Sequence, residues 1–173
     1  TDAPHRPLMV EATGAARSPA LDPGARLQHA LDLAYRHLGR RDRTVLEVRR
    51  HLEDKRVEPA SIEAAIAELC EQGYLDDGGY AQRFAEDRRL LDGWGPDRIE
   101  RKLASAGVDA ELIARALAAR NEADELEAAV TLLRRRFAEP PSDDRARERA
   151  LGLLVRRGYG LELAHDAVRA LER

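Results

Sequence analysis

The sequence predicts an all-α protein built from three tandem three-helix, helix-turn-helix-like repeats that form an elongated, curved array. Two observations support this. Apolar residues recur three and four positions apart through most of the chain, which is the period of a half-buried helix. Apolar or aromatic residues also recur in a 51-residue register, as at Leu52, Leu103 and Leu154, and such a fixed period indicates a repeated supersecondary unit. Four further sets share the register: Val48, Ile99 and Ala150; Val57, Val108 and Tyr159; Ile62, Ile113 and Ala164; Ile66, Leu117 and Val168.

Composition agrees with a helical array. Aromatic residues make up 4% of the 173 residues, whereas hydrophobic residues make up 43%. The core must therefore be built from Ala, Leu, Ile and Val, which suits close-packed helices better than a sheet. Because a unit of about 50 residues buries little core alone, we expect the units to pack end to end.

The chain divides into an arm and three repeats. Residues 1–25 contain four of the eight prolines, no aromatic residue and no sustained apolar period. We therefore predict a disordered N-terminal arm there, for which the default expectation is a terminus without function. The predicted three-helix repeats cover residues 26–73, 74–120 and 121–173.

Local signals place the helices of the first repeat. An apolar stripe over 27–38 predicts the first helix, with order beginning at Leu27. Thr44 and Glu47 fit a capping box at the start of the second helix, which is expected to run to about residue 55. Pro59 separates the second helix from the third, and Gly73 is a suitable stop.

The second and third repeats carry comparable signals. Asp76 and Asp109 are predicted N-caps, and Pro96 suits the first position of a helix. In the third repeat, prolines at 140 and 141 are expected to end one helix and Ser142 to cap the next.

The sequence contains no catalytic or cofactor-binding motif. It lacks a P-loop, a dinucleotide-binding fingerprint and a His-Glu-x-x-His pair, and its histidines are dispersed. Asp76 and Asp77 could bind Mg²⁺, although helix capping is the favoured interpretation. Cys70 lies on an apolar helical stripe, so burial is expected. We predict a protein that is not an enzyme, with no cofactor and no metal.

Charge and cysteine usage limit the environment. The net charge is −3, from 29 basic and 32 acidic residues, so the chain is not a polycation, although basic residues can still segregate locally. A single cysteine fits a reducing cytoplasm. No apolar stretch approaches the roughly 20 residues that a membrane span needs, so no membrane association is expected.

Basic residues concentrate in the second helix of each repeat and in the segment before it. If the units are oriented alike, these residues form a stripe that suits an acidic protein groove or a nucleic-acid backbone. Solvated surface charge is the simpler alternative. The members are Arg40, Arg41, Arg43, Arg49 and Arg50 in repeat one, Arg88, Arg89, Arg98, Arg101 and Lys102 in repeat two, and Arg134, Arg135, Arg136, Arg145, Arg147, Arg149, Arg156 and Arg157 in repeat three.

Each repeat resembles a helix-turn-helix, which raises the alternative of a module that acts directly on DNA. The third helix of repeat one carries three glutamates and no basic residue between Pro59 and Gly73. Carboxylates on a recognition helix would repel phosphates, which argues against sequence reading. A structural scaffold for an unrelated partner is the other alternative.

An ordered set of residues resembles the RecX family, most closely over residues 73–118. The likeness extends less strongly over 27–172, and the arm lies outside it. Arg56 departs from the repeat pattern, because the other two units have glycine at that position. The residues that carry the likeness are Tyr74-Leu75-Asp76-Asp77, Tyr80-Ala81, Phe84, Arg88, Gly93-Trp94-Gly95-Pro96, Arg98-Ile99, Leu103 and Gly107-Val108, preceded by Arg41-Asp42-Arg43-Thr44 and Leu52.

This resemblance implies a regulator without catalysis of its own. RecX proteins are arrays of three-helix modules that lodge in the groove of the RecA–single-stranded-DNA filament. They inhibit RecA ATP hydrolysis, strand exchange and co-protease activity, and they limit filament growth, so the implied role is modulation of recombination, DNA repair and the SOS response. A monomer is expected, because the repeats already bury each other's faces.

Contact residues are predicted mainly in repeat two. Arginine and aromatic residues are enriched at interface cores, although Trp94 between two glycines also suits packing between helices. Direct contact with single- or double-stranded DNA stays open. The predicted contacts with the RecA filament are Arg88, Arg89, Trp94, Arg98, Arg101 and Lys102, with Arg49, Arg50 and Arg149 as additional basic contacts.

Overall fold

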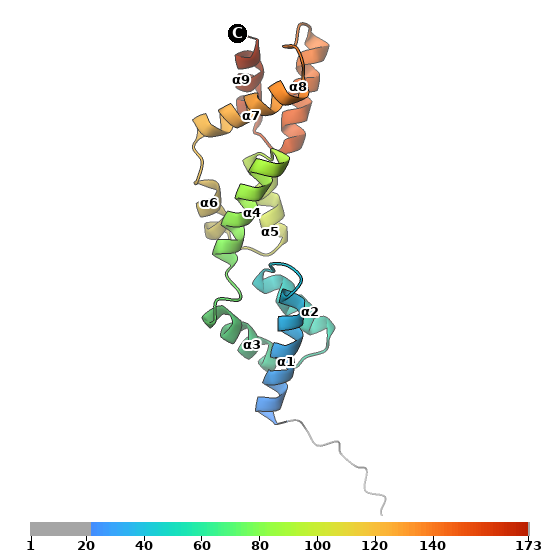
Figure 1. The fold of residues 1–173 in the computed structure, drawn as a ribbon, viewed down its shortest axis with the longest axis vertical. Helices are drawn as coiled ribbons and strands as arrows, with labels where there is room; N and C mark the ends of the chain where they lie inside the picture. The colour runs from blue at the N-terminus through green and yellow to red at the C-terminus, as the bar shows by residue number, and fades with distance from the viewer. Residues whose placement is uncertain (1–21, 173) are drawn as a thin grey trace, which may run out of the picture.

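The computed structural model describes residues 22–172. Within this range the chain forms nine α-helices and no strand, arranged as an elongated array (Figure 1). The predicted fold class is confirmed. The helices are α1 (Pro23–Leu38), α2 (Val45–Asp54), α3 (Pro59–Glu71), α4 (Asp77–Asp92), α5 (Pro96–Ser105), α6 (Ala110–Leu117), α7 (Glu122–Arg136), α8 (Asp144–Arg157) and α9 (Leu161–Leu171).

Three separate cores follow one another along the array, one in each group of three consecutive helices. We call α1–α3 unit one, α4–α6 unit two and α7–α9 unit three. Leu52, Leu103 and Leu154 are fully buried at equivalent positions of the three cores. The 51-residue register therefore corresponds to repeated core positions. The exact boundaries at residues 73 and 120 stay a prediction, and Leu75 packs in the first core.

The turn between the second and third helix is the same in all three units. Arg56, Gly107 and Gly158 have φ angles of 59°, 81° and 91°. In each unit the next residue donates its N–H over 3.1 Å to the carbonyl of the buried leucine. This closure satisfies carbonyls at the helix end. The arginine of unit one thus adopts the left-handed backbone that its glycine counterparts adopt, and the repeat survives this substitution.

Both junctions between adjacent units contain one repeated contact, in which the N-terminus of a second helix meets the turn of the next unit. The Thr44 hydroxyl donates to the Ala106 carbonyl over 2.6 Å. Exactly 51 residues later in both partners, the Gly95 N–H donates to the Arg157 carbonyl over 2.8 Å. Both junctions are therefore related by the same register, which explains how equivalent units continue into one elongated body.

Most of the predicted helix caps are confirmed, whereas the start of α1 and the cap of α8 differ from the prediction. The capping box joins Thr44 and Glu47 as expected. Helix α1 begins at Pro23 with Asp22 as its N-cap, earlier than the expected Leu27. Asp143, rather than Ser142, caps α8, because its carboxylate accepts the Ala146 N–H.

Two further expectations need comment. Cys70 is exposed, contrary to expectation, because Leu69 takes the core position at that turn of α3. The predicted disordered arm falls mainly on residues 1–21, which lie outside the described residues.

Candidate partner-binding surface

A basic groove lies where unit two meets unit three. It has a volume of about 430 Å³ and is lined by Arg98, Arg101 and Lys102 from α5, with Ser105 and Arg156. None of these four basic side chains forms an ion pair with a carboxylate in residues 22–172. The groove therefore presents uncompensated positive charge on an ordered surface.

Arg156 also lines a second groove, of about 720 Å³, between the end of α7 and α8. The second groove contains one acidic residue, Glu148. From here on, the name basic groove covers both parts: the one between units two and three, and this second one on unit three. The remaining lining residues of the second part are Arg136, Phe137, Arg145, Arg149 and Leu153.

Trp94 lies beside the basic groove, in the short connection before α5. The Arg98 guanidinium stacks over its indole at 4.2 Å from the ring centroid, and Arg88 lies 5.7 Å from the same ring. Arg98 also donates to the Arg156 carbonyl over 3.0 Å. Trp94 is half-buried and packs on the core of unit two. Its ring thus orients Arg98 at the junction and still reaches the surface.

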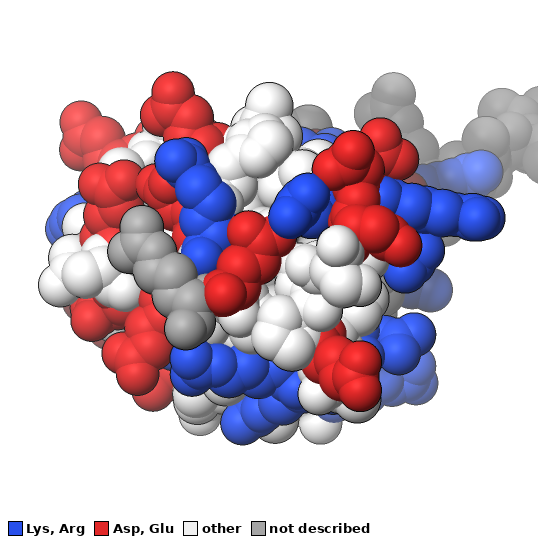
Figure 2. All heavy atoms as spheres, turned by 90° about the horizontal axis from the view of Figure 1, so that it is seen from above, with Lys and Arg blue, Asp and Glu red and all other residues white. Residues whose placement is uncertain are grey.

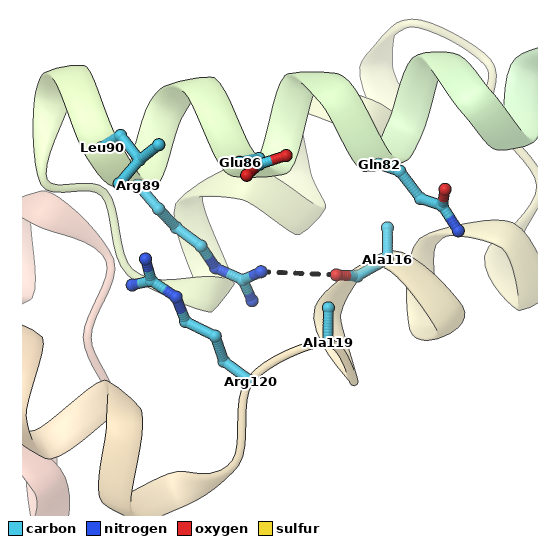
Figure 3. A pocket seen from close by; sticks show the side chains of 7 residues that line it. All are labelled: Gln82, Glu86, Arg89, Leu90, Ala116, Ala119 and Arg120. Atoms are coloured by element: carbon cyan, nitrogen blue, oxygen red, sulfur yellow. Dashed lines mark hydrogen bonds between the residues drawn. The ribbon is translucent and has the colours of Figure 1, made fainter.

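Arg89 is buried where units two and three meet and offers almost no exposed side chain for a contact. Its guanidinium forms an ion pair with Glu125 at 3.1 Å, and the two side chains are 3% and 8% exposed. It also donates to the carbonyls at the end of α6, including that of Ala116 (Figure 3). We correct the sequence-based expectation for Arg89: this residue joins α4, α6 and α7. Arg88 is half-buried and pairs with Asp92 at 2.6 Å.

The additional basic residues differ in availability. Arg49 is held by both carboxylate oxygens of Glu63, and this hydrogen bonding lowers the pKa of Glu63. Arg50 is exposed and occupies the register position of Arg101, and Arg149 lines the basic groove. The structure therefore brings Arg98, Arg101, Lys102 and Arg149 into one groove system, and leaves Arg49 and Arg50 on unit one.

Charge is segregated only in part. Viewed down the long axis from the end formed by unit three, acidic and basic side chains alternate over the surface, with basic side chains along its lower edge (Figure 2). This view looks along the array and does not show its sides, so the basic stripe expected there stays a prediction. The basic groove is one place where several basic side chains without an ion pair in the described residues lie together.

Sequence reasoning did not select Arg156, Arg145 or Arg136 as contact residues. All three stand within basic clusters of the third repeat, which was the available signal. What places Arg156 beside α5 is the docking of unit three on unit two. A 51-residue register relates equivalent positions and does not by itself indicate which surfaces meet.

Other candidate sites have structural roles. Asp76 caps α4, and Asp77 accepts the Val45 N–H over 3.0 Å, which ties α4 to unit one. Burial raises the pKa of Asp77. Among the described residues, no group of three potential ligands could hold a metal ion. No helix in that range is long and apolar enough to cross a membrane.

Comparison with known proteins identifies the family. The first three-helix domain of RecX matches residues 30–69, and the second matches residues 76–117. The regulatory protein RecX of Xanthomonas axonopodis pv. citri (strain 306) is 39% identical over 134 residues, covering 77% of this chain and 79% of the relative. That of Mycolicibacterium smegmatis (strain ATCC 700084 / mc(2)155) is 33% identical over 156 residues, covering 86% and 82%.

Solved structures share the fold. A crystal structure of RecX from Lactobacillus salivarius superimposes with a TM-score of 0.76 at 20% identity, over 86% of this chain and 98% of that one. A second crystal structure, of regulatory protein RecX, gives a TM-score of 0.69 over 84% and 77%. Together with the sequence relatives, these matches show that the chain belongs to the RecX family of regulatory proteins.

Proposed function

We propose that this protein binds the RecA–single-stranded-DNA filament and inhibits RecA ATP hydrolysis, strand exchange and filament extension, thereby modulating recombination, DNA repair and the SOS response. Membership of the RecX family supports the partner. The observation that carries the contact surface is the basic groove, in which Arg98, Arg101, Lys102 and Arg156 lie together without a compensating carboxylate. The role is non-catalytic, and we assign it to a monomer in the cytoplasm.

The elongated shape supports a mechanism of bridging. Three units docked end to end can contact more than one subunit of a helical filament and hinder movement between them (Figure 1). Several weak contacts on one rigid body bind more tightly together than any one of them alone. Charged residues at the rim of the contact mainly set the rate of association and its salt dependence.

The test is the rate of single-stranded-DNA-dependent ATP hydrolysis by the cognate RecA, with this protein added at substoichiometric ratios. The unsubstituted protein should lower the rate. Arg101→Glu/Lys102→Glu should abolish most of the inhibition, because it makes the groove acidic where the filament is expected to bind. Both side chains are exposed, so the fold should not change. Arg98→Glu is measured separately, since Arg98 also contacts Trp94 and the Arg156 carbonyl.

The control variant has the same change in net charge, placed outside the basic groove. Arg115→Glu/Arg134→Glu reverses two exposed arginines that line neither part of the basic groove and should inhibit like the unsubstituted protein. Full inhibition by a folded Arg101→Glu/Lys102→Glu protein would refute the assigned surface. No effect of the unsubstituted protein would refute the proposed function.

Direct action on DNA is the second candidate, and the same basic groove favours it. Binding of naked DNA through several phosphate contacts would weaken steeply as the salt concentration rises. The third helix of unit one argues against reading of sequence, because Glu63 and Glu71 are exposed there. A protein that leaves RecA ATP hydrolysis unchanged and binds DNA tightly would support this candidate.

A further inference from the structure

A second groove system runs between α4, the α6–α7 connection and α7, and it combines exposed leucines with arginines. One part, of about 420 Å³, lies between α4 and the end of α6. The other, of about 390 Å³, continues toward α7 and the end of α8. Both parts are lined by Arg89, Leu90 and Arg120, so they form one surface, which we call the leucine groove. It shares no lining residue with the basic groove.

The apolar part of this groove is unusually exposed. Leu90 is 62% exposed and Leu91 is 77% exposed, next to each other at the end of α4. Isolated exposed leucines are normal on a protein surface, whereas neighbouring ones that line a groove indicate a contact site. Leu132 of α7 also lines the groove and is half-buried.

The charged part is not internally balanced. Arg120 reaches back toward Arg89 along the groove (Figure 3). Glu125 pairs with Arg89, whereas the other lining arginines, Arg120, Arg135 and Arg157, form no ion pair with a carboxylate of residues 22–172. The opposing acids are Glu86 and Asp92.

Asp92 is already bound by Arg88, so Glu86 is the remaining lining carboxylate that can offset the three unpaired arginines. An incoming carboxylate would therefore meet net positive charge beside an apolar surface.

We propose that the leucine groove binds a segment of the protein partner that carries carboxylates next to an apolar side chain. This inference rests on the proposed function, with RecA as the partner. Nucleic acid fits the groove less well, because single strands are bound on exposed aromatic side chains. The one aromatic residue that lines the leucine groove, Tyr159, is 3% exposed.

The test uses the full chain with the double substitution Leu90→Ser/Arg135→Glu, which changes two exposed side chains on α4 and α7. Arg120 is left intact because it lies beside the Arg89–Glu125 pair. The matched control is Leu161→Ser/Arg134→Glu. Leu161 is 61% exposed, Arg134 is exposed, and neither lines the leucine groove.

Binding is measured for each fluorescently labelled protein against two probes at one salt concentration: RecA assembled on oligo(dT), and oligo(dT) alone. We expect the groove variant to lose about tenfold or more in affinity for the filament, the size of one interface anchor. Its affinity for oligo(dT) should not change, and the control should match the unsubstituted protein for both probes. Circular dichroism and urea unfolding confirm that all three proteins are folded.

Two results would overturn the inference. Filament affinity equal to that of the unsubstituted protein would remove the groove from the interface. An equal loss of affinity for oligo(dT) would identify nucleic acid as the occupant. Failure of the unsubstituted protein to bind the filament is a separate result, which would refute the proposed function on which the inference rests.

Discussion

Arg89 and Glu125 form an ion pair across the junction of units two and three, with 3.1 Å between nitrogen and oxygen and both side chains buried. The Arg89 guanidinium also donates to the Leu117 carbonyl over 3.0 Å. The carboxylate of Glu125 has no geometrically good hydrogen bond in the described part of the chain. The pair therefore depends on Arg89 remaining in place, and it joins α4, the end of α6 and α7.

We expect Arg89→Ala to lower the free energy of unfolding by about 3–5 kcal/mol, because it leaves the Glu125 charge buried without a partner. Replacing both groups, in Arg89→Met/Glu125→Leu, should restore most of that loss, since no buried charge remains. Urea unfolding of the three proteins measures the difference. A double variant as unstable as Arg89→Ala would show that the ion pair itself, rather than the orphaned charge, matters.

Gly107 is expected to tolerate no side chain, for two reasons. Its φ is 81°, and a Cβ there would overlap the Leu46 side chain of unit one. Gly73 has a similar φ of 77° with nothing within 4 Å of such a Cβ. Gly73→Ala should therefore cost only the left-handed backbone, about 1–2 kcal/mol.

Gly107→Ala should cost a further 1–3 kcal/mol or so, because overlap at a packed junction forces displacement. Thermal or urea unfolding of both variants compares the two positions directly. Equal destabilisation would mean that the junction between units one and two relaxes freely around an added methyl group.

Arg56→Gly is expected to leave the fold intact and to raise its stability by about 0.5 kcal/mol. The substitution removes the strain of a left-handed arginine, about 1–2 kcal/mol, while the greater entropy of an unfolded glycine offsets part of this gain. Arg56→Val should instead destabilise, because a β-branched residue adopts positive φ least readily. Differential scanning calorimetry should give the highest unfolding midpoint for Arg56→Gly, an intermediate one for the unsubstituted protein and the lowest for Arg56→Val. Any other order would contradict backbone strain at residue 56.

Unit one should lose stability in mild acid. The rings of His37 and His51 stack with their centroids 3.9 Å apart. Burial and the facing ring lower the pKa of His37, and burial and Lys55 lower the pKa of His51. A folded-state pKa below the unfolded value means that the unfolded chain binds more protons in that interval.

The contribution of the pair is therefore complete above the unfolded histidine pKa of about 6.5 and is lost as pH falls from there toward the lower folded-state values. Urea unfolding between pH 7.5 and 5 should show a smaller decline for His37→Gln/His51→Gln than for the unsubstituted protein. His165→Gln, at an exposed position on α9, is the control. Parallel declines in all three proteins would assign the acid sensitivity to other groups.

Helix caps were predictable because each depends on residues that lie close together in the sequence. The repeat was predictable because its apolar positions recur at a fixed spacing of 51 residues. Thr44 with Glu47, Asp76 and Asp109 cap helices through bonds to backbone two or three residues away. The prediction of Ser142 as the cap of α8 was wrong because its neighbour Asp143 can cap the helix in the same way, one residue later. Helix starts chosen from propensity alone are uncertain by a residue or two for this reason.

The candidate site was predictable only in part, because exposure depends on what the other units cover. Arg89 and Arg88 are adjacent basic residues on α4, yet one is buried against α7 and the other stays half-exposed. Arg156 belongs with Arg98 only because unit three docks there. Leu90 and Leu91 follow the helical pattern without any sequence signal that no other unit would cover them.

By itself, the sequence determined the all-helical class, the 51-residue repeat and most helix caps, since apolar periodicity and capping bonds act within one unit. Only the tertiary structure decided which charges are free. It sequesters Arg89 with Glu125, joins Arg98, Arg101, Lys102 and Arg156 in one groove, and leaves Leu90 and Leu91 uncovered. The physical reason is that solvent exposure and ion pairing are set by contacts between units, which the period of a repeat does not encode.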